Sequence, residues 1–126
     1  MPKHFLLACF CSFLVACAAP LVTEPLEPPV TLIINFEATD AGLAEFDAIM
    51  LGVPEGMRAE PGFISAKIYR DIESPNSYVL TEVWASQALH EGHFDRIVAS
   101  GEWAHIKTLL KSAQEMGYYS DRTLSE

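Results

Sequence analysis

Residues 61–93 read PGFISAKIYRDIESPNSYVLTEVWASQALHEGH, and this stretch decides the fold of the chain. Polar and apolar residues alternate over 63–70 and again over 76–84, and both segments are rich in β-branched and aromatic residues, which predicts two strands. Residues 71–76, DIESPN, have the Asp, Pro and Asn chemistry of a turn. Ser86 is a suitable N-cap for a helix that begins at the next residue. The stretch therefore predicts a β-hairpin followed by a helix.

The flanking segments complete a β-α-β-β-α-β order. Residues 30–37 alternate as a first strand, and Asp40 is the predicted N-cap of a helix that ends near Gly52 or Pro54. The helix after the hairpin is expected to break at Ser100-Gly101 and to continue beyond it. Residues 115–120 form a last short strand. With right-handed crossovers, this order predicts an α+β, ferredoxin-like fold in which both helices cover one face of an antiparallel sheet.

The opposite face of this sheet is also expected to be covered. In 30–37, apolar residues fall on both sides of the predicted strand. An apolar patch contributed by several strands normally marks an interface. We therefore expect a homodimer that packs sheet against sheet, as a dimeric α/β barrel.

Composition narrows the classes of partner. The chain has 126 residues, enough for one domain with a core, and a formal net charge of −9. It has no cluster of Lys and Arg to neutralise phosphates and no glycine-rich phosphate loop, so we expect no nucleic-acid partner. The three cysteines are Cys9, Cys11 and Cys17, which leaves the predicted domain without a thiol, a disulfide or a cysteine metal ligand.

The N-terminal segment has the pattern of a signal peptide. An apolar run over 5–15 is shorter than the roughly 20 residues that span a bilayer, and it ends in Leu14-Val15-Ala16-Cys17. This ending resembles the bacterial lipobox, in which the cysteine is acylated and becomes the new N-terminus. The prediction is a lipoprotein signal over 1–17 and a lipid anchor on Cys17 at the periplasmic side of the cell envelope. By resemblance to the bacterial sorting rule, Ala18 in place of Asp after the cysteine implies the outer membrane rather than the inner membrane.

Two alternatives to the lipid anchor stay open. Residues 16–18, Ala-Cys-Ala, also fit the small-x-small site of plain secretion. The run could also be a buried helix of the domain, although prolines separate it from the rest. Residues 18–29 contain several of these prolines and read as a semi-rigid linker, so the predicted folded domain spans 30–126.

The motifs of the organising stretch resemble those of a known family. PGF at 61–63, YRD at 69–71, PNSYVLTEVW at 75–84 with Ser86, and a helical histidine are similar to the antibiotic biosynthesis monooxygenase family over about residues 30–120. The resemblance implies a dimeric α+β barrel. It also implies one of several activities, because the family includes cofactor-free oxygenases of quinone precursors, heme-degrading enzymes and signal-molecule isomerases.

The resemblance favours a monooxygenase that needs no cofactor and acts on a small aromatic or quinone-like compound. In such chemistry the deprotonated substrate itself donates electrons to oxygen, and the protein supplies a dry pocket, a base and a hydrogen-bond donor. One alternative is a module that binds heme or another hydrophobic ligand without turnover. Another is a structural or interaction domain that keeps only the fold.

His93, Trp84 and Asn35 are the first candidate site residues. His93 lies four residues from Leu89 and from Ile97, so it is expected to face the sheet, either as a pocket base or as a core histidine with one hydrogen bond. Trp84 matches the Glu-x-Trp position of the family, where heme-degrading members press a tryptophan on the porphyrin, but it could simply be core. Asn35 matches an asparagine that donates to the ligand in those members, or it satisfies a strand end.

Glu82 is the fourth candidate. It matches the glutamate of the family, and it could act as an acid or base if burial raises its pKa, or form an ion pair with Arg70.

A zinc site at His90-Glu91-Gly92-His93 is disfavoured. The two histidines are three residues apart instead of the four of HExxH, and His105 is the only further ligand that the predicted domain offers.

Overall fold

The computed structural model describes residues 27–112 and 114–123. The predicted signal peptide, Cys17 and most of the predicted linker lie outside these residues. The elements, in chain order, are β1 (Val30–Glu37), α1 (Leu43–Gly56), β2 (Phe63–Arg70), β3 (Ser77–Trp84), α2 (Gln87–Ser100), α3 (Glu102–Thr108) and β4 (Glu115–Tyr119).

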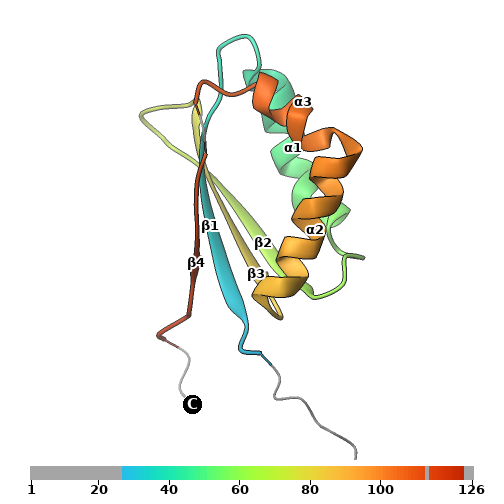
Figure 1. The fold of residues 1–126 in the computed structure, drawn as a ribbon. Coiled ribbons are helices and arrows are strands. Elements are labelled where there is room, and N and C mark those ends of the chain that lie inside the picture. Colours follow the sequence, from blue (N-terminus) through green and yellow to red (C-terminus); the bar gives the residue numbers. More distant parts are fainter. Residues whose placement is uncertain (1–26, 113, 124–126) are drawn as a thin grey trace, which may run out of the picture.

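The four strands form one antiparallel sheet in the order β2-β3-β1-β4. The helices lie together on one face of this sheet, and no helix of the described residues lies on the other face (Figure 1). The strand order and the one-sided helical layer confirm the predicted α+β, ferredoxin-like fold. None of the helices in the described ranges is long and apolar enough to cross a membrane.

The core lies between the helices and the central strand β1. Leu32, Ile34 and Phe36 alternate along β1 and are buried against the helical layer, as the period-two pattern predicted. The ring of Phe46 on α1 packs edge-on against the ring of Phe36 and against that of Tyr78, with centroids 5.2 Å apart in each pair. These aromatic contacts hold α1 against the sheet where β1 ends and β3 begins.

The predicted alternation of β2 is interrupted by a β-bulge. Phe63 pairs with Trp84, but Ser65 already pairs with Val83, so Ile64 is an extra residue and is 54% exposed. Phe63 therefore faces the helices, and its ring packs against that of Trp84 at 5.5 Å. The sequence pattern had placed Phe63 and Ser65 on the same side, because simple alternation carries no sign of an inserted residue.

Gly62 lies directly before β2 and packs against the start of α2. Its φ of 83° lies in the left-handed region, and a Cβ at this position would overlap the side chain of Leu89. Its carbonyl accepts a hydrogen bond of 2.8 Å from the backbone N–H of Ala85. The glycine thus lets the start of α2 lie directly against the end of the hairpin.

One of the two predicted helix N-caps, Ser86, is confirmed, and the other, Asp40, is wrong. Ser86 caps α2 as predicted, because its hydroxyl oxygen accepts a 3.2 Å hydrogen bond from the N–H of Leu89. Asp40 does not cap α1. It accepts a hydrogen bond from the side chain of Asn76, while Thr39 accepts one from the N–H of Gly42. Helix α1 also continues through Pro54, although proline has no N–H to donate to the carbonyl of Met50.

Candidate functional site

A cavity of about 190 Å³ lies between the helices and the inner face of the sheet. Its walls are mainly apolar side chains from all three helices and from three of the strands. The polar groups among the lining residues are Glu82 on β3, His90 and His93 on α2, and Glu102 at the start of α3. The sequence could not show whether this space is open or filled by side chains. The structure shows an open cavity, and His93, which the sequence analysis selected as a candidate site residue, lines it.

His93 faces the sheet as its helical spacing predicted. It is buried, and its ring lies 5.2 Å from that of Trp84. Its Nδ1 is 3.4 Å from Oε2 of Glu60, without the alignment of a hydrogen bond, and has no hydrogen-bond partner among the described residues. Glu60 itself forms a short ion pair with Arg96, whose hydrogen bond is the main cause that lowers the pKa of this carboxyl.

Trp84 lies next to the cavity-lining residues Glu82 and His93 without lining the cavity itself. Its side chain is fully buried, it does not belong to the residues that line the cavity, and its Nε1 donates a 2.7 Å hydrogen bond to Oε2 of Glu82. The indole therefore positions a carboxyl group and packs on His93. It lies where a core tryptophan would lie, and it also packs edge-on against the ring of His90, with centroids 5.3 Å apart.

Glu82 is a buried carboxyl group in the cavity wall, with an exposed fraction of 5%. Burial raises its pKa, and the hydrogen bond from Trp84 acts in the opposite direction. The ion pair with Arg70 is not formed. The Arg70 guanidinium lies over the ring of Tyr78, 5.5 Å from its centroid, and its Nε donates to the carbonyl of Pro75.

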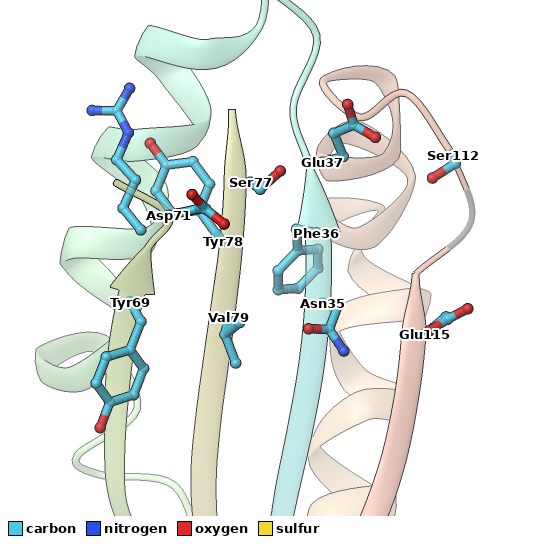
Figure 2. Close-up of a pocket in the computed structure, with 11 residues that line it drawn as sticks. Asn35, Phe36, Glu37, Tyr69, Asp71, Ser77, Tyr78, Val79, Ser112 and Glu115 are labelled. Atoms are coloured by element: carbon cyan, nitrogen blue, oxygen red, sulfur yellow. The ribbon is translucent and has the colours of Figure 1, made fainter. Parts of the chain in front are cut away.

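Asn35 is not part of this cavity, so its predicted place beside Trp84 and His93 is wrong. Its neighbours Ile34 and Phe36 face the helices, and successive side chains of a strand point to opposite faces. Asn35 is exposed on the outer face, where it lines a shallow groove together with Tyr69 and Val79 (Figure 2). The resemblance to the family had suggested its role, but the strand register decided its side.

His90 is a site residue that the sequence reasoning missed. It is 3% exposed, it lines the cavity, and its Nδ1 lies 2.6 Å from the hydroxyl of Tyr118 on β4. Burial, and secondarily the nearby His93, lower its pKa to about 4, so the imidazole is neutral at neutral pH. The available signal was its spacing of three residues from His93, which puts both rings on one side of a helix.

The two histidines do not form a metal site with other residues in the structure. No group of three or more His, Cys, Asp and Glu side chains is arranged to hold a metal ion in 27–112 or 114–123. His105, the third histidine of the predicted domain, is instead paired with Glu45, with its Nε2 2.6 Å from Oε1.

The family of the chain follows from comparison with known proteins. The model of the family described as antibiotic biosynthesis monooxygenase matches residues 29–108. The chain belongs to this family. The match covers strands β1 to β3 and all three helices, and it agrees with the resemblance in the hairpin motifs. The comparison with curated proteins found no match.

Solved structures share the fold. SnoaB from Streptomyces nogalater, a cofactor-independent oxygenase solved as a mutant, is 22% identical, with a TM-score of 0.65 over 76% of this chain and 95% of its own. Rv0793 from Mycobacterium tuberculosis is 21% identical, with a TM-score of 0.65 over 78% and 97%. A conserved protein from Methanosarcina mazei Go1 is 16% identical, with a TM-score of 0.66 over 75% and 94%. Identities this low establish the shared fold and no further detail.

Proposed function

We propose that the protein is a cofactor-independent monooxygenase that acts on a small, uncharged aromatic or quinone-like compound. The observation that carries this proposal is the apolar cavity under the helices, into which His90, His93 and Glu82 bring titratable groups. Membership of the monooxygenase family and the likeness to SnoaB, a cofactor-independent oxygenase, support it. No cofactor is invoked, because the substrate itself is the reductant of oxygen.

The size and charge of the cavity define the substrate class. An apolar cavity of about 150 Å³ holds one benzene ring, so about 190 Å³ suits one ring with small substituents. The lining residues include no Lys or Arg to pair with a carboxylate or phosphate. A neutral ring that bears hydroxyl or carbonyl groups satisfies both conditions.

Heme is a poor fit for the same cavity. A porphyrin is several times larger than a single ring, and its propionate groups need cations or water that this lining does not provide. Asn35, which the heme-degrading members implied as a ligand donor, lies on the opposite face of the sheet. Binding of a small hydrophobic ligand without turnover is the alternative that an activity test has to distinguish.

The chemistry needs three contributions from the protein. A base, which we assign to His93, removes a proton from the substrate and leaves an electron-rich anion. The anion passes an electron to O₂, and the two radicals combine to a peroxide anion at a ring carbon. This anion takes back the proton from His93 and becomes a hydroperoxide. Loss of water from this carbon leaves a carbonyl group, so one oxygen atom enters the product and the other leaves as water. The apolar walls exclude bulk water, which would otherwise stabilise the anion and slow its oxidation.

An oxygen electrode tests the proposal directly. Purified protein should accelerate O₂ consumption by one-ring hydroquinones and should act poorly on three-ring analogues that exceed the cavity. Mass spectrometry after reaction under ¹⁸O₂ should show one labelled atom in the product. Saturable binding of the same hydroquinones with no rate above the uncatalysed oxidation would leave a binding module and refute the monooxygenase.

A homodimer is also part of the proposal. The helix-free face of the sheet carries half-buried Ile33, Val79 and Val83 together with exposed Tyr69 and Tyr119. Packing of this face on its copy would remove these side chains from water.

For location, we propose the cell envelope, with the domain held at the periplasmic side by acylated Cys17. This part rests on the sequence pattern of residues 1–17.

A further inference from the structure

His90 and Tyr118 form a pair that the reaction as outlined above does not use. The hydroxyl of Tyr118 on β4 lies 2.6 Å from Nδ1 of His90, and the histidine ring is buried in the cavity wall. Burial, and the nearby charges of Glu91 and Glu82, raise the pKa of Tyr118. The phenol therefore keeps its proton and has one hydrogen to donate.

The position of that hydrogen determines the tautomer of His90. If the phenol donates to Nδ1, the proton of the neutral ring must be on Nε2. The other tautomer would use Nδ1–H as the donor and leave the phenol hydrogen without an acceptor among the described residues. It would also turn the lone pair of Nε2 toward Oε2 of Glu82, 3.9 Å away, which is electrostatically unfavourable. Both considerations favour the Nε2–H form.

This N–H has no hydrogen-bond partner in the described residues. Its distance of 3.9 Å to Oε2 of Glu82 is too long for a hydrogen bond, and that oxygen already accepts from Trp84 at 2.7 Å. Nε2 is not among the fully buried unpaired atoms, so a ligand oxygen in the cavity can reach this N–H and accept from it. The site thus has an unmet donor in the wall of an apolar cavity.

We propose that His90, held in its Nε2–H form by Tyr118, donates a hydrogen bond to the oxygen anion that forms on the substrate when the base removes its proton. The choice of ligand rests on the proposed monooxygenase function, whereas the tautomer does not. A neutral imidazole is suited to this role because it donates without bringing a full charge into a dry site. His90 is then a catalytic residue that contacts the substrate, and Tyr118 is a positioning residue.

The tautomer is tested first in the unliganded protein. Nitrogen-15 NMR of the imidazole rings should show a protonated, pyrrole-like Nε2 and an unprotonated, pyridine-like Nδ1 for His90 at neutral pH. Tyr118→Phe should give a mixture of the two tautomers. Tyr119→Phe, a change of the neighbouring exposed tyrosine on the outer face, is the matched control and should leave the signals unchanged. The reverse tautomer in the wild type would overturn the proposal.

Donation to an anion is tested with 4-nitrophenol, whose ionised form absorbs visible light. At a fixed pH, the ratio of ionised to neutral bound probe should fall about tenfold in His90→Phe, as expected for loss of one hydrogen bond to a charged group. It should fall less in Tyr118→Phe and stay near the wild-type value in His90→Gln, which retains an N–H donor. In the His90→Gln background, Tyr118→Phe should have no further effect.

An unchanged ionised fraction in folded His90→Phe would refute the donor role. The two proposals can fail separately. If the tautomer and the probe behave as expected but no hydroquinone is oxidised, the donor stands and the monooxygenase falls. If hydroquinones are oxidised while His90 has the reverse tautomer, the monooxygenase stands and the donor falls.

Discussion

The indole Nε1 of Trp84 donates a 2.7 Å hydrogen bond to Oε2 of Glu82, two residues earlier on the same strand. Residues i and i+2 of a strand share a face, so the pair lies side by side on the inner surface of the sheet. The bond occupies the oxygen of Glu82 that is nearest to His90. A fully buried tryptophan in this way orients a carboxyl group in the cavity wall without lining the cavity itself.

Trp84→Phe should lower the free energy of unfolding by about 2–4 kcal/mol. The change removes a buried hydrogen bond and leaves space beside His93. It should also raise the pKa of Glu82 further, because the indole hydrogen bond opposes the effect of burial. Chemical denaturation measures the stability, and carbon-13 NMR of the Glu82 carboxyl measures the pKa. Tyr69→Phe on the outer face is the control; a Glu82 pKa that stays unchanged in Trp84→Phe would contradict the orienting role.

Stability should depend on pH through His90. Its pKa of about 4 in the folded protein is below the ordinary value of 6.5, so the unfolded chain takes up a proton first as the pH falls. The stabilising contribution is complete above pH 6.5 and is lost between about 6.5 and 4, in total about 3 kcal/mol.

The measurement compares wild type with His90→Gln. Urea denaturation at several pH values across this window should show a stability difference that shrinks as the pH falls, because the glutamine does not titrate. The difference between the two proteins reports the pH dependence that is lost when His90 is replaced. A difference that is the same at every pH would show that His90 titrates normally in the folded protein.

His93→Ala should abolish O₂ consumption with hydroquinones while the protein stays folded. The ring is assigned as the base, and a removed general base commonly costs at least a hundredfold in rate. Asn35→Ala is the matched control, because the structure places Asn35 outside the cavity. If His93 is only a packing residue, the variant should lose a few kcal/mol of stability and oxidise at the wild-type rate.

Val79→Lys should dissociate the proposed dimer. Val79 is half-buried on the outer face and pairs with Asn35 across the β1–β3 ladder, near the middle of the helix-free surface. Burial of the added charge between two packed sheets would carry a desolvation cost. Sedimentation velocity should give a dimer for the wild type at tens of micromolar and a monomer for the variant. A monomeric wild type would remove the dimer from the proposal.

Cys17→Ala should release the protein from membranes. Acyl chains on this cysteine would replace the discarded apolar segment as the anchor, and more than one chain is needed for stable attachment. Cell fractionation and the mass of the mature protein measure both parts. Membrane retention of the variant, together with a wild-type mass that lacks acyl groups, would contradict the lipid anchor.

The element order and fold class followed from local patterns in the sequence. Alternation over 76–84 and the cap at Ser86 depend on neighbours along the chain, so they could be interpreted without coordinates. The direction of His93 was also local, because helical spacing determines which residues share a face. The hairpin motifs were enough to suggest the family that the match over 29–108 establishes.

The tertiary structure alone decided the composition of the site. The bulge at Ile64 and the outward side of Asn35 depend on the register between strands, which the sequence of a single strand does not specify. The partner of His90 is Tyr118, 28 residues away, and this contact exists because β4 pairs with β1. Contacts between distant residues depend on how whole elements pack, so a periodic pattern could predict that His93 points inward but not which groups it meets there.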